Sequence, residues 1–194
     1  NQIPILNLAE IQWKNTTTIF PNVGHIAIVL GLNCEKATHI ISITSESSKS
    51  LADFRGSLSG AAWDIYVSKL SKYIKSSRSS AGKDLYSVNG GTANPIGQAW
   101  VFKVDNAAAK TFVTAFGKLM KSIKFDGSVG VGQIIHGTDN GESMYIYATY
   151  ADLNTAFNFG AKNDSEAKAF STFSETVKGS DLSKSFTRVL IKSY

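Results

Sequence analysis

The chain has 194 residues, of which 43% are hydrophobic and 18% charged, and its formal net charge is +5. No run of about 18 apolar residues occurs, which excludes a helix that spans a membrane. The lysines are spread along the chain, so we expect no nucleic-acid partner. A single cysteine, Cys34, excludes a disulfide within the chain.

Residues 1–23 predict an extended N-terminal arm. Pro4 disfavours a helix at its start and, inside a sheet, belongs at an edge or at the first position of a strand. The apolar side chains that this arm offers to a partner sheet are those of Ile3, Ile5, Leu6, Leu8, Ile11 and Trp13.

Residues 24–95 predict a first α+β half. Alternating apolar residues indicate strands at 24–33, 38–45 and 83–88. Between the second and third of these lies a helical stretch that starts near residue 51, with a cap within residues 47–50. Gly56 and Gly60 are expected to kink or split it.

Residues 96–194 predict a second and more complete half. Its strands are expected at 98–104, 128–136, 142–150 and 186–193, with helices at 107–123, 153–157 and 164–177. Asp105 or Asn106 is expected to cap the first of these helices, and Asp152 the second. The order βαββαβ is that of a ferredoxin-like unit.

The first half reads as a degenerate copy of the second. The order ββαβ occurs in both halves. Only residues 14–23 separate the arm from the first predicted strand, which leaves no room for a helix of normal length. We therefore expect an α+β protein of two ferredoxin-like halves, the first of which lacks its first helix.

Residues 99–194 resemble the dimeric α/β-barrel superfamily, which includes antibiotic-biosynthesis-type monooxygenases and chlorite-dismutase-like haem proteins. The lysine-rich helix, the glycine-rich strand at 127–137 and the aromatic strand with Tyr145, Tyr147 and Tyr150 carry this resemblance. It implies that the two halves pack as a pseudo-dimeric α/β barrel. It also implies the cavity in which cofactor-free oxygenases of this superfamily hold a phenolic substrate.

Such a cavity would be lined by aromatic and polar side chains of the second half. The candidates are Trp100, Gln133, His136, Tyr145, Tyr147 and Arg188. The alternative is that the same aromatic side chains fill the protein core. His136 ends a strand and could be an axial ligand if haem bound, but we expect no cofactor.

Motifs of catalysis and metal binding are missing from the sequence. There is no C-x-x-C, H-E-x-x-H or P-loop, so we predict no metal site and no catalytic residue. In Gly56–Gly60 a leucine, Leu58, stands where a nucleophile elbow has its serine. Gly130-Val131-Gly132 lacks the third glycine of a dinucleotide fingerprint.

These observations favour a structural protein over an enzyme. A half that lacks a helix leaves an open sheet edge, and the arm of a neighbouring copy could complete it, which would build a filament. Because the chain begins with Asn1, we expect signal-peptide removal and a secreted or cell-surface location, with the periplasm as an alternative. The second hypothesis is a cofactor-free oxygenase or haem protein of the barrel superfamily.

Overall fold

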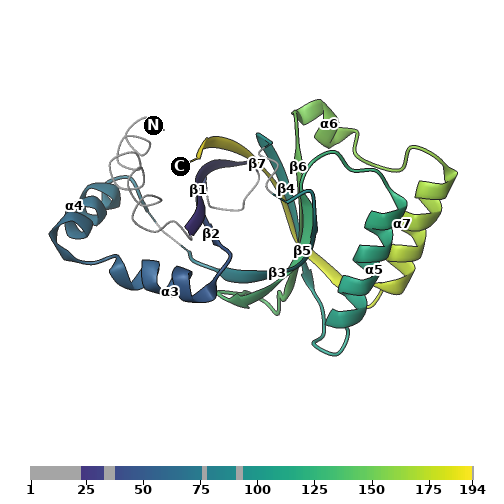
Figure 1. Cartoon of the computed structure of the whole chain (residues 1–194), viewed down its shortest axis with the longest axis horizontal. Helices are drawn as coiled ribbons and strands as arrows, with labels where there is room; N and C mark the ends of the chain where they lie inside the picture. The colour runs from purple at the N-terminus through teal and green to yellow at the C-terminus, as the bar shows by residue number, and fades with distance from the viewer. Residues whose placement is uncertain (1–22, 33–37, 76–77, 91–93, 194) are drawn as a thin grey trace. The chain divides into compact units, whose positions relative to one another are not determined.

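The computed structural model describes residues 23–32, 38–75, 78–90 and 94–193, and the chain divides into two compact units (Figure 1). Unit 1 comprises residues 1–30, 36–77 and 190–194, and unit 2 comprises residues 31–35 and 78–189. The predicted arm lies outside the described residues up to position 22, and so does the stretch in which a first helix was predicted to be missing. The arm residues concerned are Ile3, Ile5, Leu6, Leu8, Ile11 and Trp13.

The described residues of unit 1 include an antiparallel strand pair and two helices. The strands are β1 (Val23–Leu32) and β2 (His39–Ser45), and the helices are α3 (Ser48–Ser57) and α4 (Gly60–Ser71). The helical stretch is split as predicted. Gly60 has φ = 81°, a left-handed conformation that favours glycine, so α4 starts in a new direction there.

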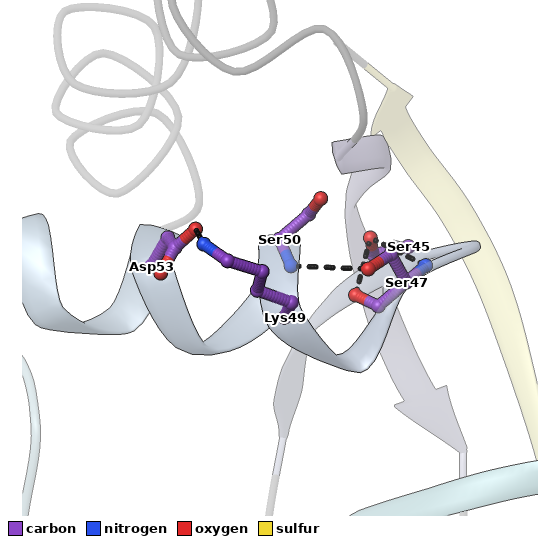
Figure 2. A network of polar contacts seen from close by, with 5 residues as sticks. All are labelled: Ser45, Ser47, Lys49, Ser50 and Asp53. Atoms are coloured by element: carbon purple, nitrogen blue, oxygen red, sulfur yellow. Dashed lines mark hydrogen bonds and ion pairs between the residues drawn. The ribbon is translucent and has the colours of Figure 1, made fainter.

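A network of serine side chains caps the N-terminus of α3 (Figure 2). The Ser47 hydroxyl accepts a hydrogen bond from the Ser50 backbone N–H at 3.3 Å, which is the cap predicted within residues 47–50. The Ser45 hydroxyl accepts from the Ser47 N–H and donates to the Ser47 carbonyl. One turn later Lys49 and Asp53 form an exposed ion pair at 2.6 Å. The local sequence thus specifies where this helix begins.

Unit 2 is built on a five-stranded antiparallel sheet in the order β7-β4-β6-β5-β3. The strands are β3 (Ala81–Val88), β4 (Ile96–Lys103), β5 (Val129–His136), β6 (Met144–Tyr150) and β7 (Asp181–Ser193), whose last four residues belong to unit 1. The helices are α5 (Ala109–Ser122), α6 (Leu153–Phe157) and α7 (Asp164–Thr176). From β4 to β7 the order is the predicted βαββαβ, so an α+β, ferredoxin-like unit is confirmed.

Among the boundaries in unit 2 that differ from the sequence prediction, those of α5 and β7 have a clear physical cause. Helix α5 begins at Ala109 without a side-chain cap, because Asp105 and Asn106 instead form a turn in which the Asp105 carbonyl accepts from the Ala108 N–H. Strand β7 begins at Asp181, earlier than predicted, because its pairing with β4 continues to Lys103. Long-range pairing here overrides the weak strand propensity of the local residues.

The core of unit 2 lies between the sheet and the pair α5 and α7, which cover the same face of it (Figure 1). Phe112 and Phe116 of α5 are 1% and 2% exposed. The ring of Phe173 from α7 contacts both of them, with centroid distances of 5.8 and 6.5 Å. No helix among the described residues is long and apolar enough to span a bilayer.

A buried carboxylate joins the turn before β6 to β7. Glu142 is 6% exposed, accepts from the Ser183 hydroxyl at 2.8 Å and pairs with the Lys184 ammonium at 3.0 Å. Burial by itself raises the pKa of Glu142, but these two hydrogen bonds and the positive charges of Lys184 and Arg78 outweigh it and hold the pKa below 4.5.

Glu142→Gln is expected to lower the free energy of unfolding by roughly 1–3 kcal/mol, because it removes a hydrogen-bonded charge from a buried site. Since the folded-state pKa is depressed, this contribution is present above pH 4.5 and is lost as the pH falls below it. Denaturant titrations at pH 7 and pH 3.5 measure both effects. Glu175→Gln, at an exposed ion pair, is the control and should change little; an equal loss there contradicts the prediction.

A buried tyrosine hydroxyl lies at the end of β6. Tyr150 is 3% exposed, and its ring packs against Phe125 and Phe159 at centroid distances of 5.5 and 5.7 Å. Among the described residues its hydroxyl has no hydrogen-bond partner, and burial raises its pKa.

Tyr150→Phe should therefore stabilise the fold by about 1 kcal/mol, which corresponds to roughly 2–4 °C in Tm. It removes a buried polar atom and keeps the ring contacts. Thermal unfolding measures the change. Tyr73→Phe, at a side chain that is 46% exposed, is the matched control. A lower Tm for Tyr150→Phe than for the wild type would show that the hydroxyl has a stabilising partner.

Candidate functional site

The two faces of the unit 2 sheet carry different side chains. Val131 and Met144 point to the helix side and are fully buried in its core. Because side chains alternate along a strand, their neighbours point the other way. We call this second face the tyrosine face; it carries Asp84, Gly97, Gly130, Gly132, Tyr145, Tyr147 and Arg188.

A carboxylate on β3 holds two tyrosines of β6. The Tyr145 hydroxyl donates to one Asp84 oxygen at 2.6 Å, and the Tyr147 hydroxyl donates to the other at 3.0 Å. The two rings are stacked, with centroids 6.3 Å apart and planes inclined by 30°. Both phenols therefore have fixed positions on the face, and the carboxylate that fixes them is itself exposed.

Glycines on β5, the strand between β6 and β3, make this arrangement possible. A Cβ added at Gly132 would clash with the ring carbon and hydroxyl oxygen of Tyr145, and one at Gly130 would lie 2.7 Å from the ring of Tyr147. Each tyrosine thus crosses β5 directly above a glycine and reaches the carboxylate on β3. On β4, a Cβ at Gly97 would lie 2.6 Å from the Nε of Arg188, so that side chain also lies across its neighbouring strand.

The site keeps both tyrosines protonated at neutral pH. Burial raises the pKa of Tyr145, and the hydrogen bond to Asp84 and its negative charge add to the effect. Burial also raises the pKa of Tyr147 to about 12, again with the Asp84 charge and hydrogen bond, while hydrogen bonds with Ser128 and Ser87 act in the opposite direction. The phenols are therefore hydrogen-bond donors, and the carboxylate is the proton acceptor of the cluster.

The structure divides the six predicted lining residues between two faces. Tyr145, Tyr147 and Arg188 lie together on the tyrosine face. Trp100 packs against the helix-side core, and Gln133 is paired across the strands with Met144 on that same side. That any of these residues lines a substrate cavity stays a prediction.

Besides Gln133, two more of the six, Trp100 and His136, lie away from the tyrosine cluster. Trp100 lines a cavity of about 240 Å³ together with Gln98, Ala99, Phe157, Ser185, Phe186 and Thr187. His136 is exposed at the end of β5, opposite Ala81. Within the described part of the chain no group of three or more His, Cys, Asp or Glu side chains could hold a metal ion.

The sequence prediction missed Asp84 and the role of the glycines. Asp84 lies within the predicted strand 83–88, although aspartate is disfavoured in strands. A disfavoured residue in a strand indicates that its side chain has a specific partner. In the sequence, Gly130 and Gly132 count as part of the glycine-rich strand that carries the family resemblance and as an incomplete nucleotide motif, without a role in side-chain packing. Alternate glycines in a strand also indicate close approach of another group, which is their role here.

Comparison with known proteins identifies solved structures of similar fold. No protein-family model matches the chain, and no curated protein matches it. A candidate monooxygenase from Lactobacillus acidophilus NCFM has a TM-score of 0.61 and 14% identity, over 96% of this chain and 86% of that one. An anthrone oxidase-like protein has a TM-score of 0.56 and 12% identity, over 96% and 86%. A candidate monooxygenase from Fusobacterium nucleatum subsp. nucleatum ATCC 25586 has a TM-score of 0.52 and 12% identity, over 95% and 87%.

The chain shares the fold of these proteins. They have the dimeric α/β-barrel fold, so the resemblance stated from the sequence is confirmed at the level of the fold. The preferred hypothesis of a secreted, non-catalytic, filament-forming structural protein is wrong, because the similar structures are candidate monooxygenases and an anthrone oxidase-like protein. The second hypothesis, an oxygenase, fits them better.

Asp84→Asn is expected to lower the pKa of Tyr147 from about 12 towards 10, but not fully, since burial remains. In the wild type the raised pKa contributes stability that is fully present below pH 10 and is lost as the pH rises through about 12. Absorbance titration of tyrosinate, with Tyr147→Phe to assign the signal, measures the shift. Asp126→Asn, at a carboxylate that is 82% exposed, is the control. An unchanged titration in Asp84→Asn contradicts the hydrogen-bonded cluster.

Proposed function

We propose that this chain is a cofactor-free oxygenase that binds a planar phenolic compound on the tyrosine face. The observation that carries the proposal is the exposed Asp84 carboxylate with its two phenol donors on the sheet of a fold shared with candidate monooxygenases. As part of the same proposal, the first half is a degenerate ferredoxin-like copy that completes a pseudo-dimeric barrel, and the chain associates with copies of itself.

The oxidation of an acidic C–H bond requires a proton acceptor and hydrogen-bond donors that stabilise the oxyanion, and the cluster supplies both. Asp84 can take the proton from an activated methylene of the substrate, which leaves a carbanion in resonance with an oxyanion. The Tyr145 and Tyr147 hydroxyls donate to Asp84 in the free protein; once Asp84 has taken the proton, each O–H can turn from the neutralised carboxyl to the oxyanion and stabilise it. Arg188, on the same face, adds a positive charge at the β7 side.

The reaction balances with dioxygen as the oxidant. The carbanion reduces dioxygen and combines with it to a peroxide anion, which takes the proton back from Asp84. The hydroperoxide then loses water and becomes a carbonyl. One oxygen atom enters the product, the other leaves as water, and Asp84 ends as it began. An anthrone would give an anthraquinone in this way, and the name of one similar structure supports it as the probe.

The test is oxidation of anthrone, followed by quinone absorbance and by oxygen consumption, with the spontaneous rate subtracted. We expect Asp84→Asn to lower kcat by roughly 10²–10⁴-fold, because it removes the proton acceptor. Tyr145→Phe and Tyr147→Phe should each cost about 10-fold or more, because each removes one donor.

The matched control is Tyr73→Phe, which removes an exposed phenol of unit 1 and should leave the rate unchanged. Circular dichroism and Tm establish that each variant is folded. An anthrone rate equal to that without protein contradicts the proposal, as does an Asp84→Asn rate equal to that of the wild type.

A further inference from the structure

We propose that a groove between α5 and α7 is a second ligand site, which takes a long-chain carboxylate. The groove lies entirely within unit 2, on the helix layer, and has a volume of about 520 Å³. This volume is within the usual range for small-molecule sites. Its lining residues are Lys110, Thr111, Thr114, Ala115, Lys118, Leu119, Ser122, Ser165, Lys168, Ala169, Thr172, Phe173 and Thr176.

The two helices that form the walls run in opposite directions. Lys103, just before α5, is paired with Asp181, just after α7, so the start of α5 and the end of α7 lie at the same end of the sheet. Lys118 therefore lies towards the same end of the groove as Lys168, near Ser122 and Ser165. Lys110 lies at the other end.

The charge of the lining is entirely positive. It includes three lysines and no acidic side chain. Among the described residues none of the three lysines forms an ion pair with a carboxylate. The acidic residues of α7 are Asp164 and Glu166 in its first turn and Glu175 near its end; Glu166 accepts a hydrogen bond from the Lys162 N–H, and Glu175 pairs with Lys178. The end with two lysines is therefore suited to an anionic head group.

The floor of the groove is apolar. Ala115 and Leu119 are 7% and 5% exposed, and Ala169 and Phe173 come from the facing helix. The hydroxyls on the walls are mostly occupied: Thr114 and Ser122 donate to the carbonyls of Lys110 and Lys118, and Thr172 and Thr176 donate in the same way along α7. The walls thus leave the lysines as the main donors.

A ligand that fits has one anionic end and an apolar tail. Residues 110–122 of α5 span about 18 Å along the helix axis, which is long enough for an extended alkyl chain. A tail over the small side chains of Ala115 and Ala169 removes apolar surface from water, and the carboxylate meets Lys118 and Lys168. A long-chain carboxylate combines these features, and the tyrosine face plays no part in its binding.

The test is calorimetric titration of the full chain with decanoate below its micellar concentration, with 1-decanol as the uncharged comparison. We expect saturable binding of decanoate, at least tenfold weaker in Lys118→Ala/Lys168→Ala. The matched control is Lys121→Ala/Lys124→Ala, which removes two exposed lysines that do not line the groove and should leave the affinity unchanged. Ala169→Leu, which fills the floor, should also weaken binding.

No saturable binding of decanoate overturns the proposal, and so does equal affinity for 1-decanol or an equal loss in the control pair. Anthrone oxidation by the lysine variants separates this proposal from the proposed function. Groove binding without oxidation leaves the second site standing and refutes the oxygenase. Oxidation of anthrone without groove binding supports the oxygenase and refutes the second site.

Discussion

The tyrosine face of unit 2 depends on the close approach of two tyrosine rings to the backbone of β5, which has no side chain beneath them. Gly130 and Gly132 let side chains that start on β6 pass over β5 and end at Asp84 on β3. Three strands are thereby tied together by side chains as well as by backbone hydrogen bonds. Any larger residue at either glycine moves a phenol away from the carboxylate.

Side chains alternate between the two faces of the same sheet, so its apolar residues lie on one face and the tyrosines on the other. On β6, Met144 and Ala148 are buried under α5 and α7, while Tyr145 and Tyr147 lie on the other side. A shift of one residue in the register of β6 would exchange its buried side chains with the two tyrosines. The Glu142 contacts with Ser183 and Lys184, made just before β6 begins, join the turn between β5 and β6 to β7.

Local patterns predicted the elements of unit 2 well, because alternation and helical spacing are properties of neighbouring residues. The two sides of β6 and the split between α3 and α4 follow from such patterns. The pairing of β3 with β5 does not, since it joins residues far apart in the chain, and only this pairing brings Asp84 to the tyrosines. The filament hypothesis is wrong because the similar solved structures are candidate monooxygenases and an anthrone oxidase-like protein; it was inferred from an open sheet edge that the sequence pattern alone suggested.

Placement of the aromatic residues on opposite sides of the sheet gives each side its own optical signal. Trp100 belongs to the helix side and borders the 240 Å³ cavity, whereas Tyr145 and Tyr147 are on the other side. A compound that settles over the phenols perturbs ultraviolet absorption near them without touching this indole. The Trp100 contribution to fluorescence, once separated from that of Trp13 and Trp63, instead reports on its own cavity on the helix side.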